Sequence, residues 1–151
     1  MIQEELTIAL LKSEWDLLQQ SVITLKLSVL KCQSIGIKEN YSFEELESFD
    51  SLTSKFNRTS DIFTQKVIRS VWMLLHEPFA PFIDMMNKCE KIALLQSADQ
   101  MIEIRDLRNQ IEHEYLPDAI RELVPEAIEL SAYLLCNIES CNIYLKNRGW
   151  V

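Results

Sequence analysis

Glycine and proline are scarce in this sequence, which holds 2 glycines and 4 prolines among 151 residues. A fold built from β-strands needs many tight turns, and glycine and proline are residues that form most of them. The scarcity argues against an all-β fold and excludes a glycine-rich phosphate-binding loop. Since a chain of this length can bury about two thirds of its unfolded surface in one core, we expect a single all-α domain over residues 1–151.

Apolar residues recur at helical spacing through most of the chain. From Ile2 to about Ser34 they alternate at spacings of three and four, which predicts an amphipathic helix that ends at Gly36. Its buried stripe consists of Ile8, Leu11, Trp15, Leu18, Val22, Leu25 and Val29. Ser42 and Glu45 have the spacing of a capping box, so a second helix should run from there to about His76. Its buried stripe consists of Phe56, Phe63, Val67, Val71 and Leu74.

Three further helices are expected in the second half of the chain. A short one should run from about Phe82 to Leu94, and a capping box of Ser97 and Gln100 should open the next. That helix must loosen before Pro117, because the residue before a proline disfavours the helical conformation. Pro125 suits the first turn of a last helix, which runs to near the C-terminus. The predicted fold is an all-α, up-down bundle of about five helices.

The sequence offers little that could bind a metal. It contains two histidines and four cysteines, and the cysteines include no C-x-x-C pair, so we expect no metal site, no disulfide and no cofactor. We expect the cysteines to act as small core residues. They are Cys32, Cys89, Cys136 and Cys141.

The net charge of −8 and the pI near 4.8 oppose nonspecific attraction to nucleic acid, which normally depends on clustered lysines and arginines. The N-terminus shows no basic leader, and no run approaches the roughly 18 apolar residues that would predict a membrane span. We therefore expect a cytoplasmic protein without a membrane partner. Any interaction with nucleic acid must therefore depend on a local site and on assistance from another molecule.

Residues 105–115, with the sequence RDLRNQIEHEY, are not explained by packing alone. On a helix that turns about 100° per residue, Arg108 lies about 40° from the centre of the buried face marked by Ile104. A guanidinium at the edge of a core is costly without a partner, because it cannot lose its charge. Glu112, four residues further on, is the partner that the sequence predicts.

Two other residues of this segment lie on different sides of the predicted helix. Tyr115 is expected within about 40° of the buried face, whereas His113 lies about 140° from Arg108 on a straight helix. Arg108 and His113 therefore come together only if the helix unwinds before Pro117 or if the site is built across a dimer. Both alternatives remain open at this point.

Arg108 is followed directly by Asn109, then after three residues by His113 and after one more residue by Tyr115. This order resembles the R-x4-H-x-Y signature of HEPN domains. It is most similar to that of the HepT-like toxins paired with minimal nucleotidyltransferase antitoxins. The similarity extends to the phrases FNRTSDIFTQKVIR, KCEKIAL and IEIRDLRNQIEHEYLPD, and covers most of residues 43–120.

The resemblance implies a homodimeric helical endoribonuclease toxin that needs no metal, with Arg108 and His113 of both chains facing a shared cleft. RNA carries its own nucleophile, the 2′-hydroxyl, so cleavage needs a group that moves protons near neutral pH and a cation that stabilises the phosphate. Histidine suits the first task and arginine the second. Asn109 would orient His113 or bind the phosphate.

The resemblance also implies how such a toxin is neutralised. In the family, the partner nucleotidyltransferase attaches adenylate to the tyrosine that corresponds to Tyr115. Negative phosphate in the cleft would then repel RNA. The implied partners are a second copy of the chain, a nucleotidyltransferase antitoxin and an RNA substrate.

A polar stripe runs along the second predicted helix at helical spacing. It consists of Arg58, Asp61, Gln65 and Arg69. An ion-pair seam between subunits and a wall of an RNA cleft explain this stripe equally well. Arg105 extends the polar edge of Arg108 and is a further candidate for lining the cleft, although a solvated face is the commoner role for such a residue.

The charge of the segment around Arg108 favours functions other than RNA cleavage. From Ile102 to Tyr115 there are four carboxylates and two arginines, so this segment is net negative and should bind RNA poorly by itself. One alternative is a noncatalytic HEPN domain that binds a substrate or nucleotide for a nucleotidyltransferase. The other is a helical scaffold for protein interactions.

Overall fold

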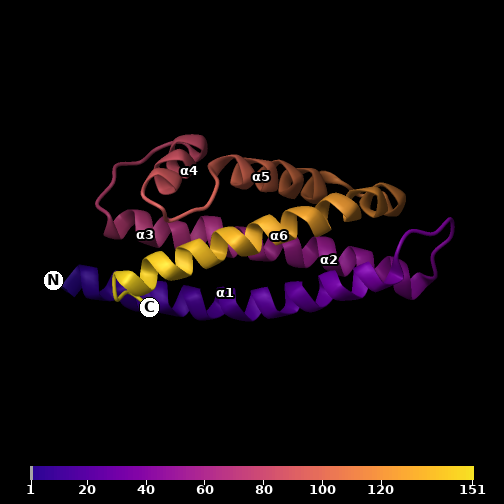
Figure 1. Cartoon of the computed structure of the whole chain (residues 1–151), viewed down its shortest axis with the longest axis horizontal. Helices are drawn as coiled ribbons and strands as arrows, with labels where there is room; N and C mark the ends of the chain where they lie inside the picture. The colour runs from indigo at the N-terminus through magenta and orange to yellow at the C-terminus, as the bar shows by residue number, and fades with distance from the viewer. Residues whose placement is uncertain (1) are drawn as a thin grey trace.

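α1 (Ile2–Ile35) and α6 (Pro117–Asn147) are the longest elements of this computed structural model, which describes residues 2–151. Figure 1 shows that they run in opposite directions, so the start of α1 and the end of α6 lie at the same end of the bundle. α1 forms one outer layer of the molecule, and α6 lies in the next. Gly36 has a φ of 72°, in the left-handed region that glycine adopts without strain, so the predicted end of α1 is confirmed.

Three consecutive segments make up the second long rod: α2 (Phe43–Asp61), η1 (Ile62–Val67) and α3 (Ile68–Leu74). The predicted capping box is present, because Ser42 Oγ accepts from the Glu45 amide at 3.2 Å and Glu45 Oε1 accepts from the Ser42 amide at 2.9 Å. η1 is a π-helical turn that the sequence did not predict. The rod is otherwise the single second helix expected from the apolar pattern.

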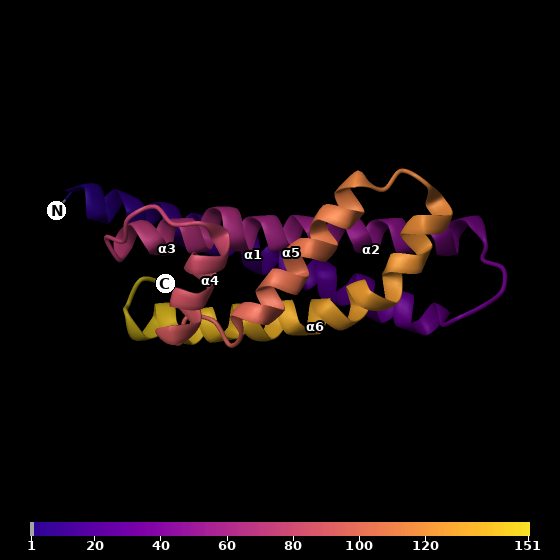
Figure 2. The same ribbon diagram turned by 90° about the horizontal axis from the view of Figure 1, so that it is seen from above.

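α4 (Phe82–Lys91) and α5 (Ala98–His113) cover the face of the bundle opposite α1 (Figure 1). Figure 2 shows α5 crossing over the layer that α2 and α6 form, and α5 packs on both of these helices. With α2, η1 and α3 counted as one rod, residues 2–151 form five helices and no strand. The predicted all-α bundle is confirmed.

Two local expectations need correction. α4 ends at Lys91 and not near Leu94, because Ala93 takes a left-handed φ of 63° that stops the helix. Ser97 caps α5 as expected, with its Oγ accepting from the Gln100 amide at 3.1 Å. The reciprocal half of that capping box is absent, since Gln100 Oε1 accepts a hydrogen bond from Asn137 instead.

The start of the last helix was also predicted wrongly. α6 begins at Pro117, and Pro125 lies inside it rather than in its first turn. A proline inside a helix removes one backbone donor and clashes with the preceding turn, which kinks the helix. Figure 2 shows that α6 changes direction after its first turns. The kink lets the first part of α6 lie beside α2 and the rest run along the bundle.

The core is one continuous cluster that draws on all of the long helices. The predicted stripe of the second helix is entirely buried, and Trp15, Trp72 and Trp150 are buried as well. Three of the four cysteines lie in this core as expected, and burial raises the pKa of the Cys89 thiol to about 12. Cys136 is exposed, which contradicts its predicted place in the core.

Asn137 is a fully buried polar residue on α6 that fixes the start of α5. Its Oδ1 accepts from the amides of Gln96 and Ser97 at 2.9 and 3.0 Å. Its Nδ2 donates to Gln100 Oε1 at 3.0 Å and to the carbonyl of Tyr133 at 2.8 Å. One side chain thus satisfies backbone and side-chain groups that would otherwise lack partners, and it sets where α5 enters the bundle.

We predict that Asn137→Ala lowers the free energy of unfolding by about 2–4 kcal/mol, because two amides lose their acceptor in a partly buried site. Urea unfolding followed by circular dichroism measures this loss. Asn87→Ala, at an exposed position on α4, is the matched control and should change stability by less than about 0.5 kcal/mol. Equal effects of the two substitutions would contradict the role given to Asn137.

Candidate functional site

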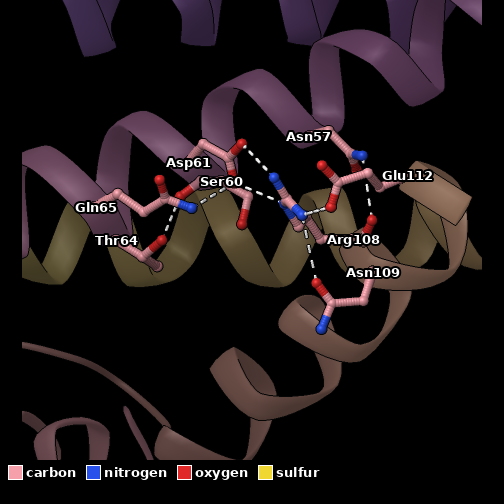
Figure 3. A network of polar contacts seen from close by, with 8 residues as sticks. All are labelled: Asn57, Ser60, Asp61, Thr64, Gln65, Arg108, Asn109 and Glu112. Atoms are coloured by element: carbon pink, nitrogen blue, oxygen red, sulfur yellow. Dashed lines mark hydrogen bonds and ion pairs between the residues drawn. The ribbon is translucent and has the colours of Figure 1, made fainter. Parts of the chain in front are cut away.

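Arg108 extends from α5 to Asp61, the last residue of α2 (Figure 3). Its Nε donates to Asp61 Oδ1 at 2.8 Å, and its Nη2 donates to Asp61 Oδ2 at 2.9 Å. The side chain of Arg108 is 19% exposed and that of Asp61 32%. A bidentate pair that is partly shielded from water is stronger and more specific in geometry than a single surface ion pair. The pair therefore fixes the guanidinium in one orientation.

The third guanidinium nitrogen, Nη1, contacts two residues of α5 itself. It forms an ion pair with Glu112, which confirms the partner predicted from the sequence. It also donates to Asn109 Oδ1 at 3.4 Å. Hydrogen bonds to Asp61 raise the pKa of Arg108 above its usual range; burial opposes this shift and Glu112 adds to it. Arg108 is a permanent cation held between two carboxylates.

Residues of the second rod hold this pair in place. Asn57 Nδ2 donates to the backbone carbonyl of Arg108 at 3.2 Å, and Gln65 Nε2 donates to Asp61 Oδ1 at 3.3 Å (Figure 3). Asp61 directly precedes η1, where the amide of Ile68 donates to the carbonyl five residues earlier. A π turn contains more residues than an α turn, so it changes the face on which later residues lie.

A groove of about 790 Å³ lies beside Arg108, between α2 and the junction of α5 with α6. Apolar side chains form part of its wall, including Phe43, Leu46, Phe49 and Ile120. Its charged lining residues are Arg58, Arg108, Arg121, Glu47, Asp50, Asp61, Glu112 and Glu114. Carboxylates outnumber arginines in this lining, so the groove of one chain is net acidic.

His113 does not lie in this groove. It is the last residue of α5, and its side chain is exposed. α5 stays helical up to this residue, and only Glu114 becomes extended, with φ −93° and ψ 124°. The helix therefore does not unwind early enough to turn His113 toward Arg108. One chain does not bring the two residues together, and their meeting across a dimer remains a prediction.

Tyr115 lines the groove from the loop between α5 and α6 and is 86% exposed. The expectation that it would lie near the buried face of α5 is wrong, because the helix ends two residues earlier. Leu116, which precedes Pro117, takes the extended conformation that a following proline favours. The loop thus turns the phenol outward into solvent.

The other predicted site residues divide into two groups. Arg58 lines the large groove, whereas Arg69 is exposed on α3 outside it. Arg105 packs over the ring of Phe82, with its guanidinium carbon 4.4 Å from the ring centroid. It shares a smaller hollow of about 150 Å³ with Gln65 and Asn109, among other residues. The polar stripe therefore serves two neighbouring hollows and not one continuous wall.

The central pairing of the site was missed by the sequence analysis. Asp61 was assigned to the polar stripe, and Arg108 was assigned a partner on its own helix. The two residues lie 47 positions apart in the chain, so no local spacing pattern links them. Both lie at the polar edge of an apolar helix, and this shared feature is the one sign that could have linked them. No feature of the sequence indicated that Asn57 binds the backbone carbonyl of Arg108.

Comparison of the chain with protein-family models, with characterised proteins and with solved structures finds no match. Within residues 2–151, no helix combines the length and apolar character that crossing a membrane requires. No group of three or more histidine, cysteine, aspartate or glutamate side chains in that range is arranged to hold a metal ion.

We predict a coupling energy of about 1–3 kcal/mol between Asp61 and Arg108, because each side chain compensates the partly buried charge of the other. A double-mutant cycle with Asp61→Ala and Arg108→Ala, measured by urea unfolding, gives this value. Lys88 and Glu77 form a more exposed pair at 3.6 Å and serve as the control, with an expected coupling below about 0.5 kcal/mol. Similar values for both pairs would show that the bidentate geometry adds nothing.

Proposed function

We propose that this chain is one subunit of a metal-independent endoribonuclease of the HEPN type, in which Arg108 and His113 of two copies act on RNA in a shared cleft. The observation that carries the proposal is the combination of two groups on α5. One is a cation held rigidly by Asp61, and the other is an exposed imidazole at the end of the same helix.

These two groups suit the cleavage of RNA at a 2′-hydroxyl. The imidazole of His113 would take the proton from the hydroxyl, whose oxygen then attacks the adjacent phosphorus. The oxygen that leaves takes up a proton from a second acid, for which the partner copy offers an equivalent histidine. Arg108 would stabilise the negative charge that grows on the phosphate oxygens. A preorganised cation is effective here because it needs little rearrangement during the reaction.

The need for a second copy follows from the directions of the two side chains. Arg108 and His113 lie about 140° apart around α5, and only Arg108 lines the groove. A two-fold partner that docks on the end of α5 would bring its own histidine toward the groove. Asn109, His113 and Tyr115 are all exposed, which leaves this end of α5 accessible to a second copy.

We further propose that a partner nucleotidyltransferase neutralises the protein by adenylating Tyr115. The exposure of its phenol supports this assignment, because a transferase must reach the oxygen. The groove beside Tyr115 is already net acidic, so one more negative phosphate would repel RNA from it. Besides Arg108, the wall of the groove contains two arginines, Arg58 and Arg121.

A second candidate is a noncatalytic module that binds a ligand for a nucleotidyltransferase. The observation that favours it is the pairing of Arg108 with both Asp61 and Glu112, which offsets the positive charge that a phosphate would need. Under this alternative the ion pairs hold the wall of the groove, and His113 is a solvated residue at a helix end.

We predict that His113→Asn slows RNA cleavage about 100-fold or more, because asparagine cannot move a proton near neutral pH. The measurement is single-turnover cleavage of a mixed RNA pool by the full chain in EDTA. His76→Asn is the matched control and should leave the rate unchanged. His76 has a φ of 57°, and asparagine tolerates this left-handed conformation.

Cleavage by the His113→Asn variant at the wild-type rate would remove His113 from the catalytic role. A wild-type chain that binds RNA or nucleotide but does not cleave RNA would favour the noncatalytic module.

We predict that Tyr115→Phe abolishes adenylation, because the acceptor oxygen is lost while the ring remains. The chain would be produced together with a nucleotidyltransferase encoded beside its own gene, and its intact mass would show a gain of one adenylate. Tyr133→Phe on α6 is the control and should still be modified. A mass gain on the Tyr115→Phe variant would move the modification to another hydroxyl.

A further inference from the structure

Arg108 borders a second, smaller hollow in addition to the large groove. This hollow of about 150 Å³ lies between α5 and the second rod, and Asp61 is the other residue that borders both. At about 30 Å³ per water molecule, the hollow has room for about five waters. A phosphate group is small enough to enter a hollow of this size.

Most residues that line this hollow are polar, and they come from two sides. On α5, Arg108 and Asn109 follow Arg105 by three and four residues, so all three lie on one side of the helix. The lining residues of the second rod are Ser60, Asp61, Thr64 and Gln65 (Figure 3). The hollow is therefore a polar site between two helical segments.

Arg105 carries the charge in this hollow that the protein itself does not balance. Within residues 2–151 Arg105 forms no ion pair, whereas Arg108 contacts two carboxylates. Arg105 Nε is buried and has no acceptor in that range. The guanidinium lies over the ring of Phe82, which attracts a cation but supplies no negative charge. Because a guanidinium cannot lose its charge, an anion beside Arg105 is favoured.

Two further donors border the hollow without an acceptor in the part of the chain that the structure describes. Ser60 is 3% exposed, and only its backbone carbonyl is engaged, as the acceptor from Thr64 Oγ1 at 2.9 Å. Asn109 Oδ1 accepts from Arg108 Nη1 at 3.4 Å, which leaves its Nδ2 free to donate. Water would satisfy the hydroxyl and the amide, but it would leave the charge of Arg105 unbalanced. An anion with several acceptor oxygens satisfies all three groups.

The charge of the lining distinguishes this hollow from the large groove. The hollow has two arginines, Arg105 and Arg108, and one carboxylate, Asp61, so its lining is net positive. In the groove, carboxylates outnumber arginines. A concave surface of one charge attracts ligands of the opposite charge. A phosphate group is therefore attracted to the hollow and repelled from the groove.

We propose that the small hollow binds a phosphate group of an RNA strand. Arg105 supplies the unpaired charge, and Ser60 and Asn109 donate hydrogen bonds. The identity of the ligand rests on the proposed function, because a ribonuclease must hold the strand beside Arg108. Arg105 is then a residue that binds the strand and not one that acts on the reacting phosphate. The hollow gives this acidic protein a local site for RNA.

The first test measures RNA binding without cleavage. The probe is single-stranded RNA of mixed sequence with fluorine in place of each 2′-hydroxyl, which removes the nucleophile. Its affinity for the full chain is measured at several chloride concentrations. Each phosphate contact of a single strand contributes about 0.7 to the slope of log affinity against log salt. Arg105→Gln should lower this slope by about 0.7 and weaken binding about tenfold or more, whereas Arg105→Lys keeps the charge and should keep the slope.

Arg148→Gln is the matched control for the loss of an arginine that lies over aromatic rings. The guanidinium carbon of Arg148 is 5.2 Å from the ring centroids of Tyr144 and Trp150, and Arg148 borders neither the hollow nor the groove. This substitution should leave the salt slope unchanged. Ser60→Ala removes one donor without adding volume and should weaken binding about threefold. Circular dichroism should show the wild-type helix content for every variant.

The second test separates an RNA strand from a free phosphate compound. Inorganic phosphate, added at constant ionic strength, should compete with the RNA probe on the wild-type chain and compete much less on the Arg105→Gln variant. A wild-type chain that binds inorganic phosphate through Arg105 but does not bind the probe would overturn the assignment to RNA.

A folded Arg105→Gln variant that binds the probe with the wild-type affinity and salt slope would also overturn the proposal. Arg105 would then only pack on Phe82. Binding of the probe that depends on Arg105, in a chain that cleaves no RNA, would support the phosphate site while removing the catalytic role of His113. Failure of the phosphate site and failure of the proposed ribonuclease are thus distinguishable.

Discussion

A guanidinium that cannot lose its charge lies in the seam between α2 and α5, and the candidate site depends on how that charge is satisfied. Asp61 binds two of its nitrogens, and Glu112 contacts the third. Loss of one partner would leave a partly buried charge without compensation, which costs more than the pair itself contributes. The fixed direction of Arg108 and the wall of the groove beside it therefore depend on this interaction.

α5 is held from both of its long neighbours. Asn137 of α6 satisfies backbone amides at its start, while Asp61 and Asn57 of the second rod hold it at Arg108. His113, the last residue of α5, and Tyr115 in the following loop are exposed. A rigid cation thus lies on α5, and an exposed imidazole lies at the end of the same helix, which is the arrangement that the proposed ribonuclease needs.

The two sides of the bundle offer different surfaces to a partner. The α5 side presents a groove with many charges, whereas α1 exposes several large apolar side chains. Because α2 and α6 separate these sides, contact on one does not obstruct the other.

Local patterns in the sequence determined most of the secondary structure. The 3–4 spacing of apolar residues, Gly36 and the Ser42 capping box each act within a few residues, so α1 and the second rod were predicted with nearly correct bounds. Pro125 misled the prediction, because Pro117 had already supplied a suitable first residue for α6. The pairing of Asp61 with Arg108, the π turn beside it and the outward direction of Tyr115 were decided only in the tertiary structure. Each depends on how helices far apart in the chain pack together, or on a backbone conformation that spacing alone does not encode.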